Sequence, residues 1–582
     1  MMPGIVSAVA VGSVLSYAAF ADGKPTSHKG ASSNSAFPDA MTVALDEKEL
    51  AKVGERDEFV SAYRRLTESQ YRNTIADIFG PEIELSARFE PEMRQDGLQA
   101  VGNADLSVTT TGLEQYFSLA RSIAQQVMAD ERRDELVGCA IDGAMSKAQA
   151  CAKEFFKETG KELYRRPLTG SEFDTVMSIW TSAAEGRENY RQAFELALVS
   201  MLVSPEFLFR TEVAERVGDT DKFRMDAYSK ASRLSYFLWD TAPDEELIAA
   251  AERGDLHTSE DLIEQVDRMM GAERFDEGVR AFFTDMLFFE HFDTVTKDSQ
   301  TYPKFSQAVA NSAREETLRF LVQLLVENDG DYRDIFTSRE TVINRSLAAV
   351  YNVPYPSRED WTSFEFSEDS QRSGVLTQVT FTSLFSHPGS SSPTLRGKHI
   401  AEIFQCTKIP DPPADVDFSK VQALEEGTVR ERLDAHRSDP TCASCHILMD
   451  PAGLALENFD SIGQFRKLEN GKPINVSADI FGQKYEGAPG IGQYLHDDPQ
   501  TSACVVQKAY SYGVGRPYDY QDAGFVQTVQ SQFEENGYKL KGLFRSILTD
   551  PKFYDVVVPD GLERAKTSAQ IETQDVAQGG LK

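Results

Sequence analysis

The chain has 582 residues, of which 41% are hydrophobic and 26% charged. This balance is typical of globular protein, so it excludes a wholly disordered or fibrous chain, and the length predicts about four domains. Acidic residues outnumber basic ones by 92 to 60, which gives a net charge of −32. Such a surface repels phosphate backbones and anionic lipid, so we expect no nucleic-acid partner, whereas a basic protein would be attracted.

The chain begins with a pattern that is typical of exported proteins. Residues 5–21 carry no charge and end in Ala19-Phe20-Ala21, a small-x-small cleavage pattern. We therefore expect a signal peptide over residues 1–21 and a periplasmic or otherwise exported mature protein. An anchoring helix is the alternative, although a run of this length is at the short limit for crossing a bilayer. No later segment has the length and apolarity of a membrane span, so we expect none in the mature chain.

Helical signals dominate after a polar, flexible lead-in over residues 22–55. Thr67 to Gln70 and Thr169 to Glu172 both match the capping box that begins many helices. The spacing of apolar residues predicts further helices within residues 113–127, 191–203, 229–240, 260–271, 275–292 and 306–327. Alternating patterns are scarce, and we expect short strands only near 374–381 and 474–486. The prediction is a mainly α protein.

One motif carries specific chemistry. Cys442-Ala443-Ser444-Cys445-His446 is a C-x-x-C-H sequence, the attachment signature of c-type haem. Two thiols one helical turn apart can both form thioethers to the porphyrin, and the adjacent His446 can bind the iron as proximal ligand. With six Cys and eight His in the chain, chance would produce the motif only about 0.0008 times. We predict one covalently attached haem c, held by Cys442 and Cys445. Zinc is disfavoured because no second cysteine pair lies nearby.

The distal iron ligand is harder to assign. No Met follows Met449, which lies only three residues after His446 and is expected to pack beside the haem edge. The histidines considered as distal ligands are His387, His399, His436 and His496. We favour His387 because it lies in a long uncharged stretch, which suggests burial, and because Pro388 and Gly389 would fix a turn. His496 comes next, and an open iron position is the alternative.

The other four cysteines, Cys139, Cys151, Cys406 and Cys504, form an even set, which in an exported protein suggests two disulfides. Four cysteines allow three pairings. The local choice joins Cys139 to Cys151. Cys406 and Cys504 would then link the segments on either side of the haem motif.

These patterns predict a multi-module helical assembly with a cytochrome c-like haem domain in the C-terminal half. Its expected parts are the signal peptide 1–21, lead-in 22–55, N-terminal helical module 56–130, a helical module 131–215, a central helical module 225–355, the haem c-binding module 370–470, a C-terminal helical module 490–558 and the tail 559–582.

The stretch from Thr441 through Cys445-His446 to Asp460 resembles the planctomycete-type cytochrome c domain family. These are exported multi-domain proteins that contain domain of unknown function 1592 and neighbouring modules. Further segments that resemble the family are residues 66–80, 164–169, 204–207, 232–239, 391–398 and 512–516. The resemblance runs from about residue 60 to 556 in the family's order. It implies the modular architecture and the haem, and it suggests a redox partner protein in the same compartment.

Three functions are compatible with these features. The leading hypothesis is electron transfer between a periplasmic oxidoreductase and a respiratory acceptor. The first alternative is a haem-dependent periplasmic oxidoreductase or peroxidase, because a simple carrier needs only about 100 residues. The lack of a second cofactor motif argues against that alternative. A structural or cell-surface protein is the third hypothesis.

Overall fold

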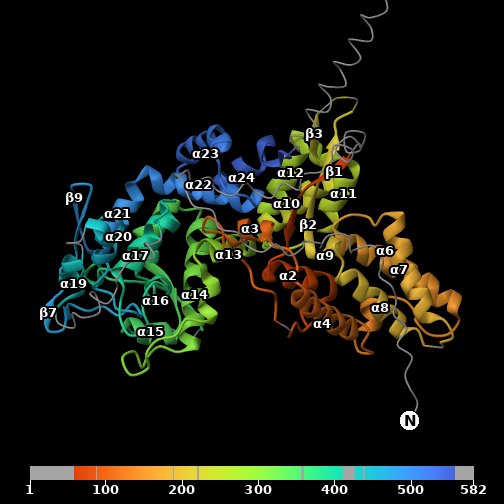
Figure 1. The fold of residues 1–582 in the computed structure, drawn as a ribbon, viewed down its shortest axis with the longest axis horizontal. Helices are drawn as coiled ribbons and strands as arrows, with labels where there is room; N and C mark the ends of the chain where they lie inside the picture. The colour runs from red at the N-terminus through yellow and green to blue at the C-terminus, as the bar shows by residue number, and fades with distance from the viewer. Residues whose placement is uncertain are drawn as a thin grey trace, which may run out of the picture. The chain divides into compact units, whose positions relative to one another are not determined.

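Helices form most of the chain, as predicted (Figure 1). The computed structural model describes residues 58–557 except 87, 188, 219, 221, 356–359, 411–426 and 437–439, and it describes no side chains at 435, 436, 440–442 and 444. The expected signal peptide, lead-in and tail lie outside these residues. Among the helices of the described part, none combines the length and apolarity needed to cross a membrane.

The N-terminal part of the described chain joins a small sheet to a group of helices. Its elements are β1 (Glu58–Arg65), α2 (Glu68–Phe79), α3 (Gln99–Gly102), α4 (Thr110–Val127), α5 (Arg133–Leu136), α6 (Met145–Tyr164), α7 (Gly170–Ala184), α8 (Arg191–Leu202), α9 (Pro205–Leu208), β2 (Phe209–Arg216) and β3 (Phe223–Met225). Both predicted capping boxes are confirmed. The Thr67 side chain accepts from the backbone amide of Gln70 at the start of α2. At the start of α7, the Thr169 side chain likewise accepts from the backbone amide of Glu172. The helices enclose an apolar cluster that includes Trp180 and Phe194.

The sheet was not predicted. Strand β1 pairs antiparallel with β2, with Phe59 opposite Ala214, and β3 adds a third strand. The pairing joins segments about 150 residues apart, and buried Arg64 lies on β1 against Glu212 on β2. Because its partner strand is so distant, β1 has no local turn signal that would have indicated the pairing. Strands β2 and β3 are close in the sequence, and their hairpin was also not predicted.

The central and C-terminal parts continue mainly as helices. The central elements are α10 (Ala227–Leu238), α11 (Glu245–Arg253), α12 (Ser259–Met270), α13 (Phe275–Met286), α14 (Gln307–Val322), β4 (Glu340–Ile343), α15 (Arg345–Tyr351) and β5 (Thr362–Glu365). The later elements are α16 (Val379–Leu384), α17 (Pro393–His399), α19 (Val429–His436), α20 (Pro440–Ala455), β6 (Leu468–Glu469), β7 (Lys472–Pro473), β8 (Ser477–Ile480), β9 (Gln483–Glu486), α21 (Gly487–Asp497), α22 (Pro499–Val514), α23 (Ala523–Glu535) and α24 (Leu540–Leu548).

Shorter helical turns connect these elements. The 3₁₀ helices are Asn103–Asp105, Asp255–His257, Phe289–Asp293, Tyr332–Phe336, Glu368–Ser370, Gly374–Thr377, Tyr520–Asp522 and Pro551–Tyr554, and the π-helical turns are Gln323–Glu327 and Ile400–Phe404. The strand expected near 374–381 is therefore wrong, because a 3₁₀ turn and α16 occupy it. The strand expected near 474–486 is confirmed as the hairpin β8–β9.

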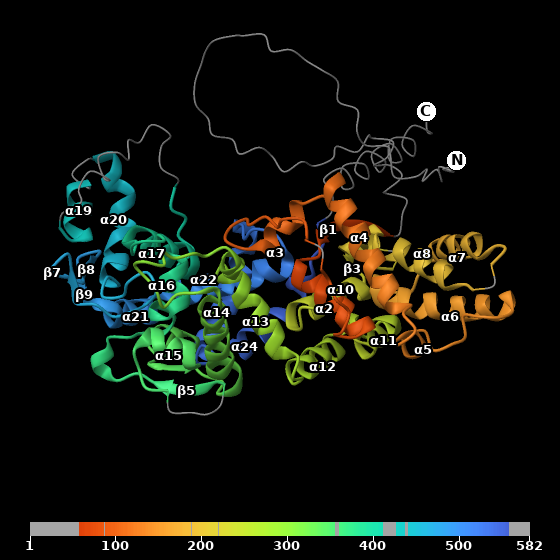
Figure 2. The same cartoon turned by 90° about the horizontal axis from the view of Figure 1, so that it is seen from below.

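The C-terminal helices return to the central part of the chain. Helices α22 and α24 contact α10, α12 and α13 (Figures 1 and 2). Phe237, Phe282 and Phe544 meet edge to face at this junction, with ring centroids 4.9–5.6 Å apart. Phe282 and its neighbour Phe283 are both buried on α13. The described residues belong to one compact unit. The central and C-terminal modules share one apolar cluster, whereas the N-terminal helices enclose another.

Candidate haem-attachment site

The C-x-x-C-H motif lies in the first two turns of α20. Cys442 and Cys445 are three residues apart in this helix, which places them about one turn apart, as the motif requires. The side chains of Cys445 and His446 are partly exposed. The motif thus lies on one helix, while the side chain of Cys442 lies outside the description.

An apolar wall borders Cys445. Ala401, Ile409 and Met449 form a small buried cluster against which Cys445 packs. Met449 is buried beside the motif, as expected for a packing residue. Apolar side chains next to an attachment cysteine suit the hydrophobic edge of a porphyrin, which loses contact with water when it is bound.

His446 is oriented by a carboxylate. Its Nδ1 lies 3.0 Å from Asp450 Oδ2 and 3.1 Å from Oδ1. An ionised carboxylate can only accept, so Nδ1 is the donor. The Asp450 side chain is fully buried, and its Oδ1 also accepts from Thr394 Oγ1 at 2.9 Å. This contact makes Nε2 the ring nitrogen that would meet a metal, a pattern common among metal-binding histidines.

Helix α17 supports α20 through two glycines. A Cβ on Gly397 would lie 1.8 Å from the carbonyl oxygen of Met449, and one on Gly453 would lie 1.8 Å from that of Pro393. Only hydrogen fits at these positions, so the two helix backbones come very close. This contact holds Thr394 against Asp450.

The chain after α20 is held by a buried arginine. Arg396 on α17 is fully buried and donates to the carbonyl oxygens of Phe459 and Asp460, each at 2.6 Å. Burial lowers its pKa. Glu457 is 1% exposed, and burial raises its pKa. Its carboxylate accepts from Ser391 Oγ at 2.7 Å and from Arg466 at 2.8 Å. These contacts fix the segment 456–460 on α17.

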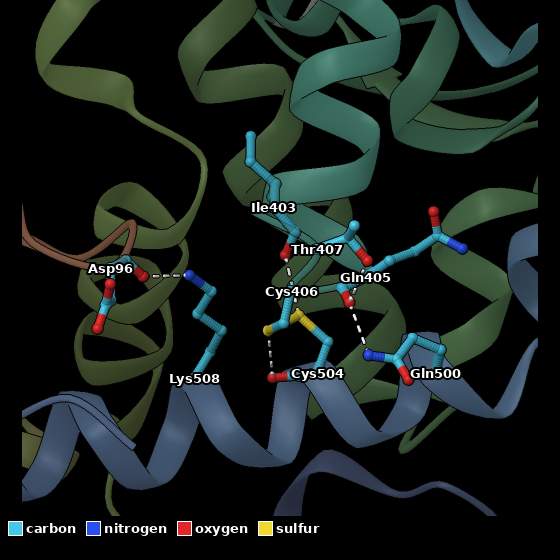
Figure 3. Close-up of a disulfide and its surroundings, with 8 residues drawn as sticks. All are labelled: Asp96, Ile403, Gln405, Cys406, Thr407, Gln500, Cys504 and Lys508. Carbon is cyan, nitrogen blue, oxygen red and sulfur yellow. Dashed lines mark hydrogen bonds between the residues drawn. A yellow bond between two sulfur atoms is a disulfide. The ribbon is translucent and has the colours of Figure 1, made fainter. Parts of the chain in front are cut away.

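A disulfide joins this region to the C-terminal helices. Cys406 is bonded to Cys504 on α22, and Cys139 is bonded to Cys151, so the favoured pairing is confirmed (Figure 3). Cys406 comes directly after the segment whose Ala401 packs towards Cys445. One turn along α22, Lys508 donates to the carbonyl oxygen of Asp96 (Figure 3). The haem motif is thus braced by elements from distant parts of the chain.

A cavity of about 430 Å³ lies beside this disulfide. Its lining includes Arg94, Phe288, Glu402, Lys408, Lys508 and Tyr518. Lys508 is 7% exposed, and burial lowers its pKa to about 8. Arg94 stacks on Phe288 and pairs with Asp285. The lining therefore combines apolar surface with charged groups of both signs.

His387, the favoured distal ligand, is not buried as expected. Its side chain is exposed, and its carbonyl oxygen accepts from Lys297 and from Ser461 Oγ, the latter at 3.1 Å. Ser461 lies beyond the C-terminal end of α20, whereas His446 is in the second turn of that helix. Much of the uncharged stretch around it is buried, but residues 387–390 form an exposed turn of the His, Pro, Gly and Ser type that is common in surface loops. The identity of the distal ligand stays a prediction.

Of the other candidate histidines, His399 and His496 have partners outside the motif. His399 is stacked on Phe385 at 3.8 Å between ring centroids, and its Nδ1 donates to the Leu395 carbonyl oxygen. Burial lowers its pKa to about 4. His399 lies on the opposite side of α17 from Gly397, which contacts α20. His496 on α21 contacts Asp497 and Asp334, and the His436 side chain is outside the description.

Sequence reasoning missed Asp450 and Thr394. The four-residue spacing of His446 and Asp450 could have indicated a contact, because such residues are neighbours on a helix. Thr394 could not have been found, since its contact depends on the packing of α17 against α20.

Comparison with known families agrees with the modular prediction. Five protein families match in order, each described as a protein of unknown function: DUF1587 at residues 64–129, DUF1595 at 151–212, DUF1592 at 225–353, DUF1588 at 372–469 and DUF1585 at 481–553. Comparison with curated proteins and with solved structures gave no significant match. The DUF1588 match spans α17, α20 and the C-x-x-C-H motif. This ordered set shows that the chain belongs to the planctomycete-type cytochrome c domain family and is a cytochrome-related protein.

Proposed function

We propose that the chain is an exported monohaem c-type cytochrome that transfers electrons between a periplasmic oxidoreductase and a respiratory acceptor. The observation that carries the proposal is the C-x-x-C-H motif on α20, with His446 held by buried Asp450. Cys442 and Cys445 would hold the haem covalently, and His446 would bind its iron. A haem held there would supply reversible one-electron chemistry between ferric and ferrous iron.

Two further features support export and electron transfer. Two disulfides are typical of proteins that mature outside the reducing cytosol. The net charge of −32 would attract a basic redox partner and speed its encounter with the chain. The large helical remainder would then act as a docking platform for such partners.

The haem itself is tested by its covalent attachment. The mature protein, made in a host that attaches haem c, should keep its haem through acid-acetone extraction. Cys442→Ala and Cys445→Ala should each remove one thioether, and the double variant should lose all covalent haem. The matched control is the pair Cys139→Ser and Cys151→Ser, which removes two cysteines far from α20 and should leave the attachment intact. Complete extraction of haem from the wild type would contradict the proposal.

The cavity beside Cys406, with its mixed apolar and charged lining, favours one second candidate function, a haem-dependent oxidoreductase or peroxidase. The segment that contributes Glu402 and Lys408 to this cavity also contributes Ala401 and Ile409 to the wall beside Cys445. A substrate in the cavity would therefore be separated from the haem by this one segment of chain. Binding of carbon monoxide or cyanide to the reduced or oxidised protein, together with peroxide turnover, would favour the enzyme. A protein that binds neither ligand would favour electron transfer.

A further inference from the structure

Asp450 is a buried carboxylate whose position on α20 suits a specific task. Its side chain is fully buried, and His446 is the histidine four residues before it. An unpaired carboxylate in such a place would be costly, so its two contacts matter. They are the His446 ring, within 3.1 Å of both carboxylate oxygens, and the Thr394 hydroxyl at 2.9 Å.

We propose that Asp450 is a positioning residue that sets the orientation and the electron donation of His446, and that it thereby lowers the reduction potential of the iron. This inference rests on the proposed function, because it requires a haem at His446. Asp450 would not touch the iron. It would act through the Nδ1–H of His446, the donor in the contact described above.

The direction of the effect follows from hydrogen bonding. A carboxylate is a stronger acceptor than a backbone carbonyl, and a charged partner makes a hydrogen bond roughly twice as strong. When Nδ1–H donates to it, the imidazole becomes a more basic ligand. A more basic ligand stabilises ferric iron more than ferrous iron, so the potential falls. Burial of Asp450 adds to this effect, because a low local dielectric strengthens the bond.

Thr394 moderates the same bond. Its hydroxyl donates to Asp450 Oδ1, one of the two oxygens that face His446 Nδ1. A donor on the carboxylate withdraws electron density and makes it a weaker acceptor for the histidine. Because Thr394 lies on α17, the close contact of α17 with α20 becomes part of the environment that tunes the ligand.

The test compares reduction potentials of the haem-loaded full-length protein by spectroelectrochemical titration. Asp450→Asn should favour ferrous iron by at least tenfold, a rise of about 59 mV for a one-electron couple. Thr394→Val should shift the potential by a smaller amount in the opposite direction, because the carboxylate keeps its charge but loses a donor. The ferric electron paramagnetic resonance spectrum should change in both variants, since the hydrogen bond to the His446 ring is altered.

Glu215→Gln is the matched control. Glu215 Oε1 on β2 lies 3.1 Å from Nε2 of His257, a histidine that is not a candidate iron ligand, so the variant also removes one carboxylate from a His–carboxylate contact. The ratio of ferrous to ferric iron at a fixed applied potential should change by less than twofold in this variant. An equal shift in Asp450→Asn and Glu215→Gln would show only the loss of a charge and would overturn the inference.

The two proposals fail in different ways. A wild-type protein without covalent haem contradicts the proposed function. A haem-loaded protein whose potential and spectrum are unchanged in both Asp450→Asn and Thr394→Val contradicts this inference alone. If Asp450→Asn does not fold, Thr394→Val decides: a lowered potential supports the role of Asp450, and an unchanged one overturns it.

Discussion

Glu316 shows how a single buried acid can set the pH response of this fold. It lies on α14, is 0% exposed, and accepts from Thr341 Oγ1 at 2.8 Å and from the Tyr351 hydroxyl at 2.6 Å. Burial is the main reason that its pKa is raised to about 7. The folded protein therefore prefers Glu316 to be protonated.

The expected consequence is a loss of stability as pH rises. In the unfolded chain Glu316 ionises near its ordinary pKa, whereas in the folded chain it resists ionisation until about pH 7. The contribution of Glu316 to the free energy of unfolding is thus complete below about pH 4.5 and is lost as the pH rises from there to about 7. Relative to Glu316→Gln, the wild type should lose roughly 1–3 kcal/mol over this window. Thermal unfolding of both proteins at pH 4.5 and pH 8 measures the difference, and parallel changes in the two would contradict the assignment.

At the scale of elements, the contact between α17 and α20 is the part of the fold most sensitive to small changes. Gly397 and Gly453 each face a backbone carbonyl oxygen of the other helix, and a backbone atom cannot move aside as a flexible side chain can. The same contact brings Thr394 to Asp450 and so to His446. Damage here should affect both stability and the candidate haem site.

Gly397→Ala is therefore expected to force the helices apart. Overpacking of this kind typically costs about 1–3 kcal/mol, and the haem spectrum should change because Asp450 loses Thr394. The control is Gly524→Ala on α23, where an added Cβ meets nothing within 4 Å and where alanine should stabilise a helix by up to about 1 kcal/mol. Melting temperature and the haem absorption spectrum report both effects. A Gly397→Ala protein as stable as Gly524→Ala would mean that the helices are not packed this closely.

The two disulfides differ in the length of chain that they close. Cys139 and Cys151 are 12 residues apart, whereas Cys406 and Cys504 are 98 apart. In the chain-entropy account, disulfides that close loops of these lengths stabilise the folded chain by about 3 and about 4.7 kcal/mol. Replacing Cys406 and Cys504 by Ser should therefore lower the melting temperature more than replacing Cys139 and Cys151. If replacing Cys139 and Cys151 lowers the melting temperature more, the packing around Cys406 and Cys504 holds the fold without the longer bridge.

The elements also show what the sequence can predict. The capping boxes at Thr67 and Thr169 were found because each is complete within four residues, and the hairpin near 474–486 is similarly local. Strand β1 was missed because its partner β2 lies about 150 residues away. His387 was expected to be buried because its neighbours are uncharged, yet small polar residues also form exposed turns. The C-x-x-C-H motif can be read directly from the sequence, whereas Asp450 and Thr394 required the packing of two helices.

At the scale of the whole molecule, the dominant property is negative charge. The 92 acidic and 60 basic residues belong to a chain whose described modules share one compact unit. A long-range field of this kind changes how fast partners meet the protein rather than which fold it adopts. It therefore bears directly on the proposed electron transfer.

Electron transfer with a basic partner should consequently depend strongly on salt. With a small basic cytochrome as the probe, the bimolecular rate at low ionic strength should fall at least tenfold by 0.3 M salt, because the Debye length shrinks below about 10 Å. A small anionic reductant such as dithionite is the control, and its rate should rise with salt because screening relieves repulsion. Stopped-flow absorbance at the haem band follows both reactions. The contrary outcome is a basic probe that reacts at the same rate at all salt concentrations while the rate of the anionic one changes. That result would show that the net negative charge does not guide the basic partner to its docking site.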